Sequence, residues 1–391
     1  MKVVVLGGMG IQGRAALADL ASSSSVEAII CADLDLTEFD SKTGFFNTSK
    51  VTSVKLDASS KNELKTFLQE GADVIIDLLP RQFTDSVCRA AIEAGIGVVN
   101  TNYGYPIACL DDRAKKAGVS IMPECGLDPG IDLIIYGQAV RRFDEIHVIN
   151  SYCGGFPEKS ACDNPLNYKV SWTWEGVLSS TCRDARFIKN GRAVSISADK
   201  QHARDQIHTI DYPGLGRLEA IPNGDAVFFT DLLGITDTIR ETGRYSLRWP
   251  GWSAFWHPLK QLGFLDEKAV AGLPCEVSAI QFLDKLMGPR LQYQNDEKDL
   301  VVMLNVFEGL CGGKQTRRTV RMLIERDLNT GLMAMSKGVG FTASIVAQMM
   351  AGGEITATGV LTPTLDVPGR LFMDRMAERG IIVEEAEEII D

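Results

Sequence analysis

The glycine pattern near the N-terminus constrains the fold more than any other feature of the sequence. A β-branched run over residues 2–6 predicts a buried parallel strand, and the sequence GMGIQG follows at residues 8–13. A helical pattern then covers residues 14–20, and a second predicted strand, residues 26–32, ends in Asp33. Strand, glycine turn, helix, strand and acid in this order form the complete dinucleotide-binding fingerprint. The chain therefore begins as a dinucleotide-binding domain.

Each residue of the fingerprint has a physical task. Gly8 permits the tight turn, Gly10 lets the backbone approach the pyrophosphate, and Gly13 lets the helix pack on the strand. The N-terminus of the helix supplies N–H donors to the phosphates. Asp33 is placed to accept both ribose hydroxyls, and its charge repels a 2′-phosphate, so NAD is favoured over NADP. The alternative for Asp33 is a solvated carboxylate at the end of a strand.

Strands and helices continue to alternate up to residue 122, which predicts an α/β fold with a Rossmann doubly wound parallel sheet. The loops that follow its strands should face the cofactor, because ligands of such sheets bind beyond the carboxyl ends of the strands. The predicted cofactor-binding residues are Gly8, Gly10, Ile11, Gln12, Gly13, Asp33, Leu79 and Pro80.

The second half of the chain has a different pattern and predicts a mixed-sheet α/β domain. A helix is expected from Asp128, as N-cap, to about residue 143, and a glycine turn at 311–314 predicts a hairpin. We assign residues 1–127 to the dinucleotide-binding domain and 128–335 to a domain for substrate binding and dimerisation. Residues 336–391 are expected to pack back on the first domain, with the acidic tail as a solvated face.

Composition excludes several classes of protein. The 391 residues carry a formal net charge of −11, which argues against nucleic-acid binding. No apolar run is long enough to span a membrane. The nine cysteines include no CxxC pair, so neither a structural metal site nor disulfides are expected, and the cytoplasm is the expected location.

Two motifs in the middle of the chain resemble the saccharopine dehydrogenase family. They are ECGLDPGID at residues 124–132, and SYCGG at 151–155 followed by NPLNYKVSW at 164–172. A looser likeness at RWPGW (248–252) and near the C-terminus extends the resemblance over nearly the whole chain. It implies hydride chemistry at a C–N bond, a small-molecule amino-acid substrate, and a second domain that often forms a homodimer.

The resemblance contains two departures. Saccharopine reductases of this family use NADP, whereas Asp33 is more similar to the NAD-using lysine 6-dehydrogenase branch. They also carry an arginine in the segment that resembles residues 221–225, where this chain has Gly224. If that arginine binds a substrate carboxylate, this protein binds the carboxylate by other means or binds another substrate.

The candidate catalytic residues are Asp128 and Glu124, since C–N oxidation needs a group that exchanges a proton with the amine. Asp128 lies on the loop after the sixth strand, which faces the nicotinamide; its alternative role is a helix N-cap. Glu124, on the same loop, either pairs with the amine or supports the loop.

The candidate substrate-binding residues are Asn102, Tyr103, Cys153 and Arg248. The resemblance implies that Asn102 and Tyr103 contact the substrate. It also implies that Cys153 lines the substrate site; the alternative is that Cys153 is simply a small apolar residue of a strand. Arg248 is expected to hold a carboxylate, or else to form a surface ion pair.

The sequence thus predicts an NAD(P)-dependent oxidoreductase acting on the C–N bond of a lysine-derived amino acid, similar to saccharopine reductase. The alternatives within enzymes are an NAD-dependent lysine 6-dehydrogenase and a dehydrogenase of carboxylated polyamines. An alternative of another class is a non-catalytic NAD-binding sensor.

Overall fold

A computed structural model of the chain describes residues 1–390 and divides into two compact units. Unit 1 contains Met1–Gln138 and Met335–Ile382, so it is built from both ends of the chain. Unit 2 contains Ala139–Ala334 together with the last strand, which begins at Val383. Each unit has its own sheet and is described by itself.

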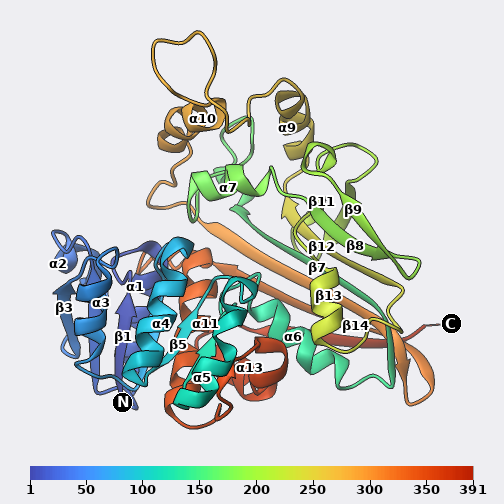
Figure 1. Cartoon of the computed structure of the whole chain (residues 1–391). Helices are drawn as coiled ribbons and strands as arrows, with labels where there is room; N and C mark the ends of the chain where they lie inside the picture. The colour runs from blue at the N-terminus through green and yellow to red at the C-terminus, as the bar shows by residue number, and fades with distance from the viewer. Residues whose placement is uncertain (391) are drawn as a thin grey trace. The chain divides into compact units, whose positions relative to one another are not determined.

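Unit 1 contains a seven-stranded sheet in which all paired neighbours run parallel (Figure 1). Its strand order, β15-β6-β5-β4-β1-β2-β3, is the Rossmann order extended by one strand from the C-terminal part of the chain. The predicted doubly wound sheet is confirmed. The strands are β1 (Lys2–Leu6), β2 (Ala28–Asp33), β3 (Val51–Lys55), β4 (Val74–Asp77), β5 (Gly97–Asn100), β6 (Ser120–Met122) and β15 (Gly359–Val360).

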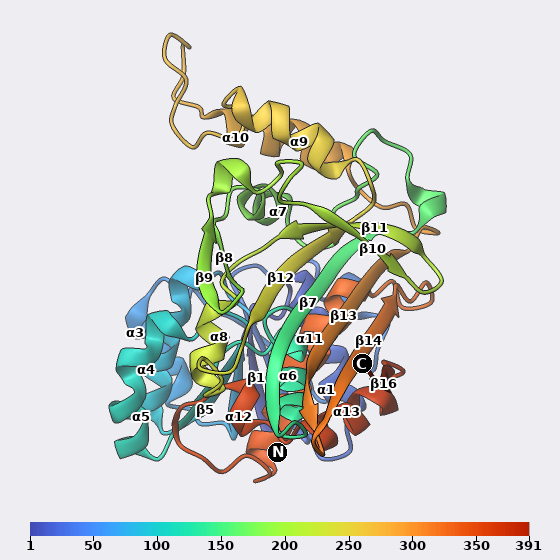
Figure 2. The same cartoon turned by 90° about the vertical axis from the view of Figure 1, so that its right-hand side faces the viewer.

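Helices cover both faces of this sheet. Figure 2 shows α3, α4 and α5 on one side of it and α1, α6, α11 and α13 on the other. The helices of unit 1 are α1 (Ile11–Ser22), α2 (Phe39–Thr43), α3 (Lys61–Leu68), α4 (Thr84–Ala94), α5 (Asp111–Ala117), α6 (Ile131–Val140), α11 (Ala334–Ala351), α12 (Pro363–Asp366) and α13 (Gly369–Glu378). Two 3₁₀ helices, η1 (Arg81–Phe83) and η2 (Tyr105–Leu110), follow β4 and β5.

The C-terminal helices of unit 1 pack directly on α1. The Asp19 side chain of α1 is 5% exposed; it forms an ion pair with Arg379, just after α13, and accepts hydrogen bonds from Ser344 and Gln348 of α11. Gly340 of α11 lies so close to α1 that a Cβ there would be 2.6 Å from the Gln12 carbonyl oxygen. The helix that begins at the dinucleotide fingerprint is therefore fixed by residues more than 300 positions away in the sequence.

Unit 2 contains a nine-stranded mixed sheet of order β10-β11-β12-β7-β13-β14-β16, with β8 paired to β12 and β9 to β8. All its pairs are antiparallel except β7 with β12. The strands are β7 (Glu145–Pro157), β8 (Ala185–Lys189), β9 (Arg192–Ile196), β10 (His208–Tyr212), β11 (Gly216–Pro222), β12 (Glu241–Arg248), β13 (Asp299–Cys311), β14 (Lys314–Glu325) and β16 (Val383–Ile389).

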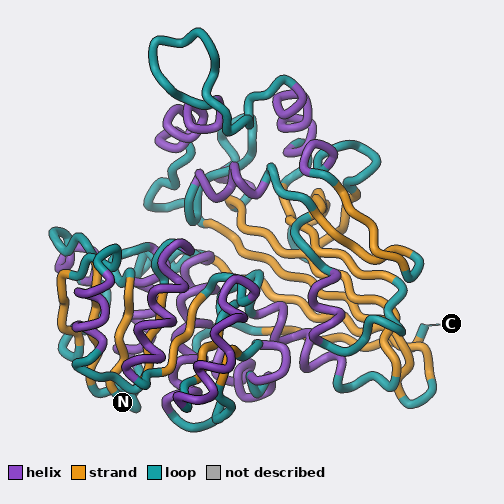
Figure 3. The backbone as a smooth tube through the Cα atoms, in the orientation of Figure 1, coloured by secondary structure: helices purple, strands orange, loops and turns teal. Residues whose placement is uncertain are grey.

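An aromatic core covers one end of the second sheet. The helices of unit 2 are α7 (Trp174–Ser180), α8 (Val227–Leu232), α9 (Trp252–Gln261) and α10 (Ala279–Met287). Figure 3 shows α7, α9 and α10 gathered at the same end of the unit. The buried rings of Trp174 and Trp252 there contact Tyr168, and both also contact the ring of Trp256.

The acidic tail is exposed along almost its whole length, as expected, but it also forms a strand. This strand, β16, pairs antiparallel with β14 in unit 2. The physical reason is charge: β14 presents arginines at the positions where β16 presents glutamates. Arg318, buried, forms ion pairs with Glu385 and Glu387. Packing of the C-terminal segment on the first unit therefore ends at Ile382.

None of the helices formed within residues 1–390 is long and apolar enough to cross a membrane.

The glutamates on the two faces of β16 should contribute differently to the stability of the protein. Two double variants test this, and each removes two negative charges. E385Q/E387Q leaves the buried Arg318 guanidinium without a carboxylate and should destabilise the protein by about 3 kcal/mol. E384Q/E388Q removes partners of the more exposed Arg321 and Arg317 and should cost less than about 1 kcal/mol. Urea unfolding of both variants measures the difference, and equal losses would contradict this account of the tail.

Candidate active site

The glycine turn brings α1 against the end of β1. A Cβ at Gly13 would lie 2.3 Å from the Gly7 carbonyl oxygen, and one at Gly8 would lie 2.6 Å from the Cys31 sulfur. The contact at Gly13 is with backbone, so only glycine fits there, whereas a side chain at Gly8 would require the Cys31 side chain to move. Gly7 has a φ of +76°, which turns the chain toward the crevice at the end of the sheet. The fingerprint predicted from the sequence forms the expected turn.

The N-terminus of α1 offers backbone N–H groups to an anion. Gly10 stands at its N-cap and no side chain caps the first turn. A 12-residue helix whose first N–H groups have no side-chain acceptor, and whose dipole is positive at this end, suits a pyrophosphate. Ile11 and Gln12 form the first turn, and the Gln12 Oε1 atom is buried without a hydrogen-bond partner.

The Asp33 carboxylate lies at the end of β2 and is tied to the glycine turn. Its Oδ2 accepts the Met9 N–H at 2.9 Å and its Oδ1 accepts the Leu34 N–H at 2.8 Å. The carboxylate is therefore fixed beside the turn that would bind the phosphates. In this position it can accept ribose hydroxyls and would repel a phosphate on the same ribose.

The crevice of the sheet lies between β1 and β4. β1 pairs with β2 on one side and β4 on the other, so the strand order reverses here and ligands of such sheets bind at this point. Leu79 and Pro80 follow β4, and the Leu78 carbonyl oxygen is 3.0 Å from where a Cβ on Gly7 would stand. The loop after β4 thus lies directly against the glycine turn.

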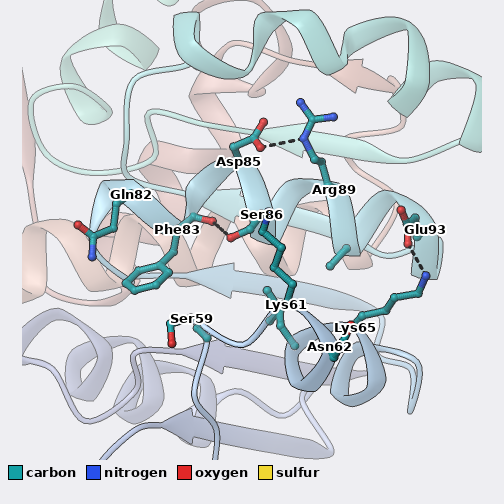
Figure 4. Close-up of a pocket in the computed structure, with 13 residues that line it drawn as sticks. Ser59, Lys61, Asn62, Lys65, Gln82, Phe83, Asp85, Ser86, Arg89 and Glu93 are labelled. Carbon is teal, nitrogen blue, oxygen red and sulfur yellow. Dashed lines mark hydrogen bonds and ion pairs between the residues drawn. The ribbon is translucent and has the colours of Figure 1, made fainter.

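A groove opens beside this edge of the sheet, between α3 and α4, with a volume of about 570 Å³ (Figure 4). Its lining begins at Ser59, after β3, and at Gln82 and Phe83, after β4. The ion pairs Arg89–Asp85 and Lys65–Glu93 stand further along its walls. The sequence analysis did not identify this groove, because its walls come from two helices that the sequence does not place side by side.

Asn102 and Glu124 form one hydrogen-bonded loop cluster after β5 and β6. The side-chain amide of Asn102 donates a hydrogen bond to the Thr84 hydroxyl at 2.9 Å. The backbone carbonyl of Asn102 accepts the Glu124 N–H, also at 2.9 Å. Glu124 is 2% exposed, and its Oε1 accepts the Gly104 N–H at 3.1 Å. The structure thus shows Glu124 supporting the loop that carries Asn102 and Tyr103.

The expected helix N-cap at Asp128 is wrong. α6 begins at Ile131, and residues 126–130 form a separate tight turn closed by the bond from the Gly126 N–H to the Pro129 carbonyl. The Asp132 carboxylate accepts a backbone N–H at the start of the helix, from Gly130 at 2.8 Å. The Pro129 ring and the extreme φ of Gly130, 148°, delay the start of the helix.

The two remaining candidates, Cys153 and Arg248, lie in unit 2. Cys153, buried within β7, is paired in register with Ser246 of β12. Arg248 ends β12 and is 8% exposed, so it is not a surface ion-pair residue. Its guanidinium stacks on Tyr168 at 5.2 Å and on Trp252 at 5.1 Å, and its Nη1 donates to the Leu247 carbonyl. An arginine held between aromatic rings is pre-oriented for a planar anion.

Gly224 adopts a conformation that disfavours a side chain. Its φ is +67°, and its carbonyl accepts the Arg186 N–H at 3.0 Å. An arginine at this position would be strained in this backbone. The departure noted in the sequence is therefore matched by the local structure.

Asp77 and Asn100, which the sequence analysis did not single out, end β4 and β5 opposite each other. Both are fully buried; Asp77 accepts the Leu79 N–H and Asn100 accepts the Asn102 N–H. Burial raises the pKa of Asp77 to about 7. The sequence does contain one sign of this buried carboxyl group, because Asp77 ends an otherwise apolar strand sequence.

Among residues 1–390 no group of three or more His, Cys, Asp or Glu side chains is arranged to hold a metal ion.

The fold and the glycine turn define a two-unit protein with a dinucleotide-binding site. The saccharopine dehydrogenase NADP binding domain matches residues 3–122, and the saccharopine dehydrogenase C-terminal domain matches residues 126–381. The chain belongs to the saccharopine dehydrogenase family.

Two relatives and one solved structure show how far the similarity extends. A saccharopine dehydrogenase [NADP(+), L-glutamate-forming] of Schizosaccharomyces pombe is 29% identical over 86% of this chain and 88% of its own length. The mitochondrial alpha-aminoadipic semialdehyde synthase of Mus musculus is 27% identical over 97% of this chain, which spans 47% of that protein. Apo saccharopine dehydrogenase (L-Glu forming) from Saccharomyces cerevisiae matches with a TM-score of 0.85 at 24% identity, over 99% of both chains, and supports the fold.

Two buried carboxyl groups predict how stability depends on pH. Burial raises the pKa of Asp77 and that of Asp132 to about 7, well above the unfolded value of about 3.9. Each group therefore stabilises the fold most at acid pH, and this contribution is lost as the pH rises through about 7. The melting temperature, at constant ionic strength, should fall by several degrees between about pH 5 and about pH 8.

D132N should flatten part of this pH dependence, whereas D112N, which alters an exposed carboxylate on α5, should leave it unchanged. A melting temperature that rises over the same interval in the unmodified protein would contradict the assignment.

Proposed function

We propose that this protein is an NAD(P)-dependent oxidoreductase that acts on the C–N bond of a lysine-derived amino acid, with saccharopine as the first substrate to test. The observation that carries the proposal is the glycine turn and α1 N-terminus in a chain whose two halves both match saccharopine dehydrogenase domains. The names of the relatives supply the substrate class.

The cofactor site fits a dinucleotide through residues of unit 1. Gly8, Gly10 and Gly13 leave room for the pyrophosphate, whose charge the α1 N-terminus would stabilise. We expect the adenosine end on the β2–β3 side of the crevice, where the groove at Ser59 and Phe83 opens. A bound nicotinamide would accept the hydride.

NAD is proposed as the preferred cofactor, although the matching domain is described as NADP binding. Asp33 is the reason: its fixed carboxylate would meet a 2′-phosphate with a like charge.

We propose Asp128 as the residue that exchanges a proton with the substrate amine. It lies within the tight turn of residues 126–130, on the loop that follows β6, and the loops after the strands of such a sheet face the ligand. Glu124 is proposed as a positioning residue, because its carboxylate holds the Gly104 N–H. Asn102 and Tyr103, on the supported loop, are proposed substrate contacts.

Arg248 is the proposed ligand of a substrate carboxylate in unit 2, and Cys153 the proposed lining residue. Lys169 is a weaker candidate, since its ammonium already forms ion pairs with Asp163 and Glu297 and is 2% exposed. Homodimer formation and a cytoplasmic location also stay proposals; sedimentation and fractionation test them.

The proposed activity is tested by the absorbance of reduced nicotinamide, with saccharopine or lysine supplied separately. Saccharopine with NAD should give turnover, and D128N should lower kcat by about 10²-fold while leaving cofactor affinity unchanged, because a general acid–base group is lost. D112N, an exposed carboxylate on α5, is the matched control and should behave as the unmodified protein does.

Each other outcome has a defined meaning. Turnover with lysine alone would replace saccharopine with the lysine 6-dehydrogenase reaction. Binding of NAD by calorimetry, without turnover of any tested amine, would favour the sensor and overturn the proposed activity.

The cofactor preference depends on Asp33. D33S removes the charge that would repel a 2′-phosphate, so the ratio of the NADP to the NAD dissociation constant should fall by at least about tenfold. D35S alters an exposed carboxylate that accepts the backbone N–H of Thr37, and it should leave this ratio unchanged. Calorimetric titration of both cofactors gives the ratios; tighter binding of NADP than NAD by the unmodified protein would reject the preference.

A further inference from the structure

Asp77 lies at the floor of the crevice rather than at its rim. It is the last residue of β4, in register with Leu6, the last residue of β1, and with Asn100, the last residue of β5. Gly7 follows Leu6 directly and begins the glycine turn. The carboxyl group therefore stands at the point where the strand order reverses, beneath the position where the dinucleotide crosses the sheet.

The Asp77 side chain is only half satisfied. Its Oδ1 accepts the Leu79 N–H at 3.1 Å, but its Oδ2 is buried without a hydrogen-bond partner. Asn100 opposite has the complementary arrangement: Oδ1 accepts the Asn102 N–H, and Nδ2 is buried without a partner. Both side chains are 0% exposed. A buried carboxyl group with one unsatisfied oxygen calls for an explanation.

No cation from the packed elements neutralises Asp77. β1 and β5 contribute Leu6 and Asn100 beside it, neither of which ionises. On α4, burial and then the charge of Asp77 raise the pKa of the Cys88 thiol, so Cys88 stays neutral. Asp85 and Arg89, further out on α4, are exposed and pair with each other. Asp77 is therefore neutralised either by a proton from solvent or by a positive charge on a ligand.

We propose that Asp77 sets the preference of this protein for oxidised over reduced cofactor, by acting as a counter-charge to the oxidised nicotinamide ring. The oxidised ring carries a positive charge and the reduced ring carries none, so only the oxidised cofactor gains from a carboxylate at the crevice floor. This inference rests on the proposed function, because it assumes a nicotinamide dinucleotide in this site.

The titration of Asp77 makes the preference depend on pH. Burial raises its pKa to about 7, so the unliganded protein holds the acid form below neutrality and the carboxylate above it. The oxidised cofactor binds best to the carboxylate form, and the reduced cofactor binds best to the acid form. The ratio of the dissociation constants, reduced over oxidised, therefore rises with pH, and binding of the reduced cofactor near neutrality is accompanied by uptake of a fraction of a proton by Asp77.

The test is a calorimetric titration of NAD⁺ and NADH at about pH 6 and at about pH 8.5, with the same titrations of D77N. In the unmodified protein the ratio of the dissociation constants should rise by about tenfold, which is about 1.4 kcal/mol. D77N retains an oxygen for the Leu79 N–H but cannot ionise, and its ratio should be independent of pH.

Asp73 provides the matched control. It stands just before β4, at the opposite end from Asp77, and its carboxylate likewise accepts a backbone N–H, from Lys2 at 2.6 Å. D73N should keep the full pH dependence. If D77N fails to fold, D77S replaces it with a smaller side chain that retains a hydroxyl acceptor.

The outcomes separate this inference from the proposed function. Failure to bind either NAD or NADP would reject the proposed function itself. Binding of both redox forms with a ratio that does not change with pH, or a pH dependence that persists in D77N, would overturn the role of Asp77 and leave the dehydrogenase proposal standing.

Discussion

The contact on which the first unit depends is the approach of α1 to the Gly7 carbonyl at Gly13. With a Cβ only 2.3 Å from that oxygen, any other residue would push the helix off the strand. The contact aims the N-terminus of α1 at the crevice, and the Asp33 bond to the Met9 N–H holds the turn from the other side. The anion site and the ribose site are thus parts of one rigid loop.

The same helix explains why the chain returns to the first unit. α1 must be held along its length as well as at its start, and α11 and α13 do this through the buried Asp19 and the close approach of Gly340. A buried carboxylate with an arginine partner and two further donors specifies one position for the C-terminal helices. The long-range packing is therefore part of what positions the cofactor site.

The sequence predicted best what is determined locally. The hairpin predicted from the glycine turn at 311–314 forms between β13 and β14, which turn at Gly312 and Gly313, both with positive φ. Prediction failed where the cause is non-local. The exposed acidic tail shows no sign of forming a strand until the arginines of β14 are placed beside it, and α6 looks as if it starts at Asp128 until the tight turn at 126–130 is seen. Likewise, an aspartate ending β4 is unremarkable until it is found fully buried opposite Asn100.

The two carboxylates of the dinucleotide site act on different charges. Asp33, at the end of β2, accepts a backbone N–H through each oxygen, and the proposed preference for NAD rests on its charge. Asp77, at the end of β4, keeps one buried oxygen without a hydrogen-bond partner, and the proposed response to the charge of the nicotinamide ring rests on this group. On these two proposals, selection of the cofactor and response to its redox state are separable, because they depend on different residues, which end the two strands on either side of β1.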